Sequence, residues 1–180
     1  MKFKFLFLLF GLSTFFITGF SACKTTVKSN YNAQKKQPAL LGSWEMVEVH
    51  WKTKDTVYSI PKAQYGLFIF EEDRYSIMWT PIDKPRTPFI NLSKPTDEEK
   101  MAGFSSVVFN GGTYTMTDST LTTTALIAKV PGFEGGKQFY RYTIKDDLLR
   151  LTFFDETYPN GQKPEWYGKY VTEFVMRRSK

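Results

Sequence analysis

The sequence predicts an all-β protein whose eight strands form an up-and-down antiparallel barrel, with one short helix between the third and fourth strands. Aromatic residues make up 17% of the chain, and such side chains favour strands. Short runs of strand-forming residues follow one another through tight turns, as in antiparallel hairpins. A β-sandwich is the main alternative, but its Greek-key returns are longer than these turns. Eight strands close into a barrel that can hold one small ligand.

The elements follow from alternating runs and the turn residues between them. The strand-like runs are 41–52, 63–71, 74–80, 112–117, 120–129, 137–145, 148–154 and 166–177. In the first run, strict alternation places Trp44, Met46, Glu48 and His50 on one face, and Trp51 on the other.

The segment between the third and fourth runs predicts a loop followed by a helix. Prolines at positions 81, 85, 88 and 95 exclude a central strand there. Thr96 and Glu99 have the spacing of a capping box, in which each side chain bonds the backbone N–H of the other residue. We therefore expect a helix over about 97–105.

The first 22 residues have the pattern of a secretory signal peptide. Lys2 and Lys4 precede an apolar run over 5–20, and small residues lead to Cys23, the only cysteine. This arrangement resembles the lipobox of bacterial lipoproteins, which implies cleavage before Cys23 and acylation of that cysteine. Several acyl chains hold a protein firmly on a membrane. A signal peptide with an incidental cysteine and an uncleaved membrane anchor are the alternatives.

Charge divides the mature chain into a basic tether and a neutral domain. Residues 23–37 are polar without apolar periodicity, and we interpret them as a lipidated cysteine followed by a flexible tether. The domain, expected over 38–180, carries 18 basic and 18 acidic side chains. The net charge of +6 therefore comes from the first 37 residues, and it does not indicate nucleic-acid binding. The tether lysines can meet anionic lipid headgroups or simply keep the segment solvated.

The two ends of the predicted barrel carry a pattern found in lipocalins. Gly42 and Trp44 open the first strand, and Arg177 and Arg178 close the last. This pattern, with similar blocks at 40–47, 65–76, 109–115 and 139–151, resembles the bacterial lipocalin-like domain family over about 40–178. The resemblance implies that the indole of Trp44 crosses the closed end of the barrel. It also implies that one of the two arginines covers the ring, at cation–π distance.

A ligand site inside such a barrel needs an apolar cavity with a few polar groups. The candidates are aromatic and basic residues on alternating positions of the strands: Tyr75, Trp79, Tyr114, Phe139, Arg141 and Tyr142. The pattern does not fix which strand faces point inward. If Arg141 points inward, it can hold a carboxylate or phosphate headgroup; if outward, it pairs with an acidic neighbour.

No set of residues in the sequence predicts catalysis or metal binding. His50 is the single histidine, so a His/Cys metal site of the usual kind is not expected. Nucleophile elbows, phosphate loops and dinucleotide fingerprints are also missing from the sequence. We therefore expect no catalytic residues, no metal and no cofactor.

The sequence favours a monomeric lipoprotein that binds a small, mostly apolar or amphipathic ligand in the bacterial cell envelope. Lys24, directly after Cys23, resembles the signal for the outer membrane. One alternative is a non-catalytic interaction module whose barrel is filled by its own side chains. Another is a barrel isomerase or cyclase.

Overall fold

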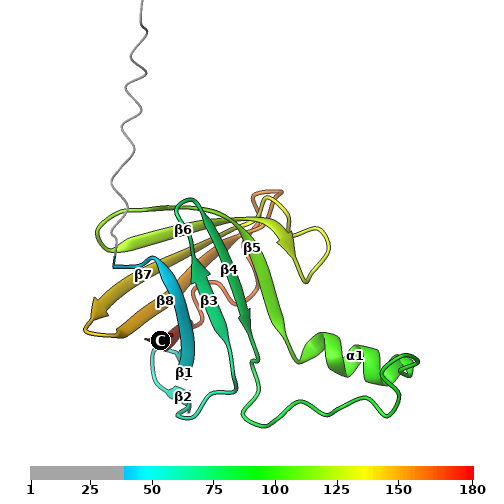
Figure 1. Ribbon diagram of the computed structural model, residues 1–180. Helices are drawn as coiled ribbons and strands as arrows, with labels where there is room; N and C mark the ends of the chain where they lie inside the picture. The colour runs from blue at the N-terminus through cyan, green and yellow to red at the C-terminus, as the bar shows by residue number, and fades with distance from the viewer. Residues whose placement is uncertain (1–38) are drawn as a thin grey trace, which may run out of the picture. The chain divides into compact units, whose positions relative to one another are not determined.

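The computed structural model describes residues 39–180 (Figure 1). The predicted signal peptide, the lipidation of Cys23 and the tether lie outside these residues. The elements are β1 (Gly42–Lys52), β2 (Val57–Ile60), β3 (Leu67–Phe70), β4 (Arg74–Trp79), α1 (Asp97–Ser105), β5 (Val108–Met116), β6 (Thr120–Ala128), β7 (Lys137–Lys145), β8 (Leu148–Thr157) and β9 (Val171–Arg178).

The strands form a closed antiparallel barrel, which confirms the predicted fold class. From β3 to β9 each strand pairs with the next, and β1 pairs with β9 to close the barrel. One edge of β1 carries two short strands: β3 pairs with its first four residues and β2 with its last four. Nine strands therefore occupy eight positions around the barrel.

Strand β2 was not predicted, and four other strands differ in length from the prediction. β8 extends to Thr157 rather than ending at residue 154. The predicted run 63–71 is a strand only over β3, because Ala63 and Gly66 make single hydrogen bonds to β1 before pairing becomes regular. β5 begins at Val108 rather than at residue 112. β9 begins at Val171, because backbone bonds from Tyr167 to Pro164 and from Lys169 to Trp166 fold the preceding residues into turns.

Three β-bulges interrupt the pairing of the strands. One leaves Leu126 of β6 without a partner in β5, and the other two change which side chains of β1 and β8 face the interior. In β1, Met46 pairs with Met176 and Glu48 with Val175, so that Val47 has no partner. In β8, Phe154 is the residue without a partner, because Tyr140 pairs with Phe153 and Phe139 pairs with Asp155. An extra residue reverses the alternation beyond it. Strict alternation was therefore wrong for the second half of β1, where Trp51 rather than His50 faces inward.

The barrel has two different ends. At the closed end β1 begins, β9 ends and tight turns join β3 to β4, β5 to β6 and β7 to β8. The open end carries the longer connections 80–107, 129–136 and 158–170. Helix α1 belongs to the first of these connections and lies outside the barrel wall in Figure 1, with no buried residue. Its capping box is present as predicted, with Thr96 as the N-cap residue.

Candidate functional site

The closed end is built around Trp44, which is fully buried. Its indole Nε1 donates to the carbonyl of Leu40 at 2.9 Å, and the guanidinium of Arg178 lies 4.2 Å from the ring centroid. Arg178 also donates to the carbonyl of Leu41 at 2.8 Å. Gly42 has a φ of 112°, which favours glycine, and a side chain there would approach the Arg178 guanidinium. Indole and guanidinium together cover this end of the barrel.

Inward-facing tyrosines fill the half of the barrel next to the closed end, here called the packed half. Tyr114 donates to the carbonyl of Glu71 at 2.7 Å, and Tyr142 donates to the carbonyl of Thr117 at 2.9 Å. Tyr75 is buried beside them in the same hydrophobic core. Burial raises the pKa of Tyr75 to about 12, and burial with nearby carboxylates, Asp73 first, does the same for Tyr114. This half of the interior is therefore packed with protein side chains.

The half of the barrel next to the open end contains a pocket of about 290 Å³, here called the open-end pocket. Most of its lining is aromatic, and includes Trp51, Phe68, Trp79, Phe153, Trp166 and Tyr170. The rings contact one another: Phe153 lies 5.1 Å from Tyr140 and 4.8 Å from Trp166 between centroids. Such a lining favours a small apolar ligand, because burial of its surface among rings replaces contact with water.

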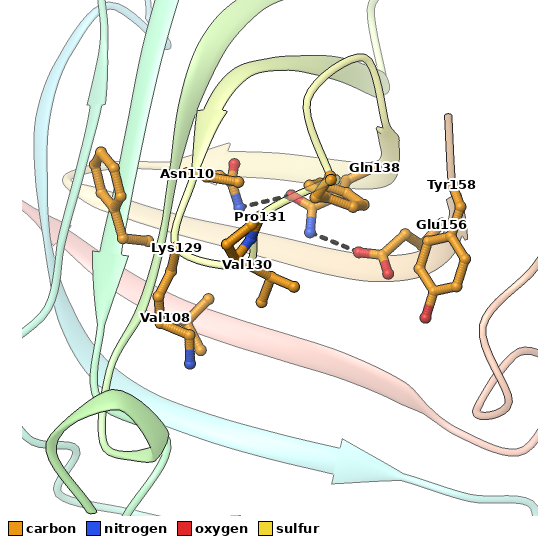
Figure 2. A pocket seen from close by; sticks show the side chains of 12 residues that line it. Val108, Asn110, Lys129, Val130, Pro131, Gln138, Glu156 and Tyr158 are labelled. Carbon is orange, nitrogen blue, oxygen red and sulfur yellow. Dashed lines mark hydrogen bonds between the residues drawn. The ribbon is translucent and has the colours of Figure 1, made fainter. Parts of the chain in front are cut away.

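A short chain of polar side chains crosses one wall of the open-end pocket. Asn110 Nδ2 donates to Gln138 Oε1 at 3.2 Å, and Gln138 Nε2 donates to Glu156 Oε2 at 2.8 Å (Figure 2). Tyr140 donates to the same Gln138 oxygen at 2.9 Å. Burial raises the pKa of Glu156, although the hydrogen bond from Gln138 acts in the opposite direction. The wall thus combines a partly desolvated carboxyl group with two amides.

The same wall separates the open-end pocket from a second hollow, drawn in Figure 2. This hollow has a volume of about 360 Å³ and lies against the loop that follows β6. The open-end pocket and the second hollow share four lining residues: Val108, Asn110, Gln138 and Glu156. A ligand in the open-end pocket therefore meets polar groups on the side that faces the second hollow.

Comparison with known families gives a match to a model described as a lipocalin-like domain over residues 41–172. The chain belongs to the lipocalin-like domain family. No curated protein matches it. A solved structure, that of an uncharacterized protein from Bacteroides eggerthii, is similar with a TM-score of 0.38 and 14% identity, covering 77% of this chain and 98% of that chain.

Within this lipocalin-like barrel, the predicted ligand residues fall into three groups. Trp79 lines the open-end pocket. Tyr75, Tyr114 and Tyr142 point inward but belong to the packed half. Phe139 and Arg141 were proposed as ligand residues, but they lie on the outer face of β7 and do not line the pocket. The guanidinium of Arg141 lies 4.3 Å from the ring centroid of Phe154.

The two terminal arginines also separate. Arg178 covers Trp44, whereas Arg177 is exposed on the other face of β9. Alternation predicted that only one of them reaches the indole, but the sequence did not decide which.

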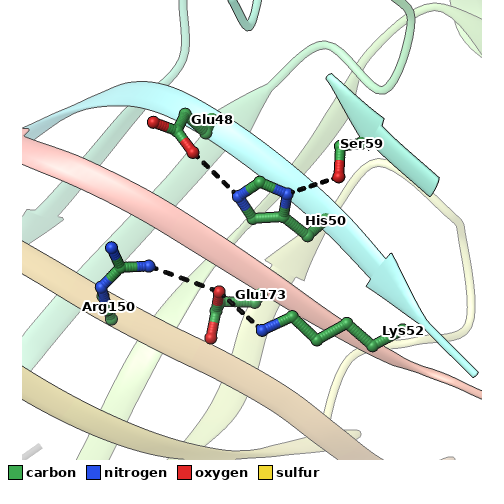
Figure 3. A network of polar contacts seen from close by, with 6 residues as sticks. All are labelled: Glu48, His50, Lys52, Ser59, Arg150 and Glu173. Atoms are coloured by element: carbon green, nitrogen blue, oxygen red, sulfur yellow. Dashed lines mark hydrogen bonds and ion pairs between the residues drawn. The ribbon is translucent and has the colours of Figure 1, made fainter. Parts of the chain in front are cut away.

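The outer face of the lipocalin-like barrel carries His50 in a polar network (Figure 3). Its Nε2 lies 2.9 Å from Glu48 Oε2, and its Nδ1 lies 2.8 Å from Ser59 Oγ. Nearby, Glu173 pairs with Lys52 at 2.8 Å and with Arg150 at 3.5 Å.

Among residues 39–180, no three His, Cys, Asp or Glu side chains gather closely enough to hold a metal ion. In the same residues no helix is long and apolar enough to cross a bilayer.

Trp79 is the only predicted ligand residue that lines the open-end pocket, and the residues that the sequence analysis missed include Trp51, Glu156 and Trp166. Trp51 and Glu156 follow the bulges in β1 and β8, so alternation assigns them to the wrong face. Trp166 was placed in a strand but belongs to the turns before β9. Only the aromatic character of these segments was a visible signal.

Proposed function

We propose that this protein binds a small, mostly apolar ligand in the open-end pocket and acts as a lipid-anchored monomer in the bacterial cell envelope. The observation that carries the binding proposal is the aromatic pocket of about 290 Å³ inside the barrel. The family match supports ligand binding in general. Storage, transport or scavenging of the ligand would each use the same site.

The pocket also favours ligand binding over the two alternatives. A filled barrel, as expected for a purely structural interaction module, would leave no such volume. A barrel isomerase or cyclase needs a second group that exchanges protons near neutral pH. Beside Glu156 the ionisable groups that line the pocket are Tyr140 and Tyr170, and burial raises the pKa of both.

The ligand is best sought in protein extracted gently from its own membrane and measured by native mass spectrometry. We expect a non-covalent mass on the wild-type protein. Val108→Trp, which places a large ring at the pocket wall, should remove that mass. Thr143→Trp on the exposed outer face of β7 is the matched control and should retain it. Repeated recovery of empty, folded wild-type protein would contradict the binding proposal.

The membrane anchor is proposed from the lipobox-like pattern that ends at Cys23. Cells that express the full chain should incorporate radiolabelled palmitate into the wild-type protein and not into Cys23→Ala. The wild-type protein should fractionate with the outer membrane. Labelling of the Cys23→Ala protein, or an unlabelled wild type, would overturn the anchor without affecting the pocket.

A further inference from the structure

Glu156 places an unpaired carboxyl group in the wall of an aromatic pocket. Among residues 39–180, no lysine, arginine or histidine forms an ion pair with it. The next basic residue along the chain, Lys163, instead pairs with Asp155 at 2.6 Å. Neighbouring residues of a strand face opposite sides, and the β8 bulge determines that Glu156 rather than Asp155 faces inward.

Two acceptor oxygens near Glu156 receive no hydrogen bond from the described residues. Both donors to Gln138 Oε1, the Asn110 amide and the Tyr140 hydroxyl, are used, and so is the Gln138 N–H that reaches Glu156. Asn110 Oδ1 is buried without a partner among the described residues. Only one oxygen of the Glu156 carboxyl group accepts a hydrogen bond there. A group on this side of the pocket can therefore donate hydrogen bonds to the open oxygens of Asn110 and Glu156.

Aromatic rings next to the carboxyl group favour a positive charge on that donor. Tyr140, Phe153, Trp166 and Tyr170 form a continuous series with centroid separations of 5.1, 4.8 and 5.6 Å. All four line the same pocket as Glu156. Ring faces attract cations, and a carboxylate in a desolvated site gains more from a cation than one in water.

We infer that the open-end pocket takes a hydrophobic amine, whose ammonium group pairs with Glu156 while its apolar part lies among the aromatic rings. This inference rests on the proposed ligand-binding function and names the ligand class. An inward Arg141 would have favoured a carboxylate or phosphate headgroup, but Arg141 lies outside the barrel, and such a headgroup would meet the carboxylate of Glu156 in the pocket.

The test compares three probes of similar size and different charge: 2-phenylethylamine, 2-phenylethanol and 3-phenylpropionate. Affinity of the purified full protein for each would be measured by calorimetry at pH 7.5. We expect the amine to bind at least about ten-fold more tightly than the alcohol, the scale of one charged hydrogen bond. We expect the carboxylate to bind most weakly.

Two variants locate the effect. Glu156→Gln removes the charge and keeps an oxygen for Gln138, so the preference for the amine should disappear while alcohol affinity stays within about two-fold. Asp155→Asn removes a neighbouring charge on the outer side and should keep the preference. Thermal unfolding verifies that both variants are folded.

The outcomes separate the inference from the function on which it rests. If the alcohol binds and the amine has no advantage, or if Glu156→Gln retains the advantage, the amine inference is wrong and ligand binding stands. If none of the probes binds to the folded wild-type protein, both the inference and the pocket's proposed function are contradicted.

Discussion

The closed end and the open end of the barrel use the same kinds of residues for different purposes. At the closed end, Trp44 and Arg178 are joined by a cation–π contact, and both donate to backbone carbonyls. At the open end, Trp51 and Trp166 line a pocket, and Glu156 has no cation partner among the described residues. The indole and the guanidinium of the closed end have partners within the protein, whereas Asn110 and Glu156 at the open end leave acceptors for a ligand.

The two ends therefore contribute differently to stability and to binding. Satisfied polar groups and buried rings lower the free energy of the folded state. A desolvated carboxyl group without a cation raises it, so Glu156 is expected to lower the stability of the fold. The account therefore predicts separate consequences for mutations at the two ends.

The largest expected effect is on stability, from Trp44→Ala. Loss of a fully buried indole should lower the free energy of unfolding by about 3–5 kcal/mol. Chemical denaturation followed by circular dichroism measures this change. A nearly neutral result would show that the indole does not hold the closed end together.

A smaller loss is expected from Arg178→Met, which removes the guanidinium above Trp44 and its bonds to the first turn. The free energy of unfolding should fall by about 1–3 kcal/mol. Arg177→Met is the matched control on the exposed face and should change stability by less than about 0.5 kcal/mol. Equal effects of the two variants would mean that the Arg178 contact adds nothing specific.

The smallest effect, and one of opposite sign, is expected from Glu156→Gln. Burial raises the pKa of Glu156 in the folded chain, and Asp155 acts in the same direction. The folded state then binds a proton more tightly than the unfolded state, so this residue reduces stability as pH rises through that raised pKa. The variant should therefore be more stable than wild type at pH 7.

The pH dependence provides the check on this prediction. The advantage of Glu156→Gln should shrink on acidification and vanish below about pH 4, where the carboxyl group is protonated in both states. Asp155→Asn, which loses the pair with Lys163, should show no such gain. A variant less stable than wild type at pH 7 would show that the Glu156 carboxylate is already compensated.

Much of the closed end could be predicted from the sequence, because its signals are local. Gly42 and Trp44 lie two residues apart at the start of one strand. The capping box of α1, in a connection of the open end, could be predicted for the same reason, because it spans only Thr96 to Glu99. Strand β2 was not predicted, because three of its four residues are exposed and the turn before it has neither glycine nor proline.

Trp79 was predicted at the open end, but much of the pocket could not be, because the bulges in β1 and β8 determine which residues reach it. Val47 and Phe154 look like ordinary strand residues, yet each adds one position that has no partner. Whether a strand accommodates an extra residue depends on its neighbours in the barrel, which the sequence does not specify. Trp51 and Glu156, which lie beyond these bulges, reach the pocket only for that reason.

The central claim is that a ligand occupies the open end and leaves the closed end unchanged. The four tryptophans provide the most direct measurement, because Trp51, Trp79 and Trp166 line the pocket and Trp44 lies at the other end. Titration of the ¹⁵N-labelled protein with 2-phenylethylamine should shift the indole N–H signals of the first three and leave that of Trp44 in place. A shift confined to Trp44, or no shift of the three pocket signals at saturating amine, would contradict the account.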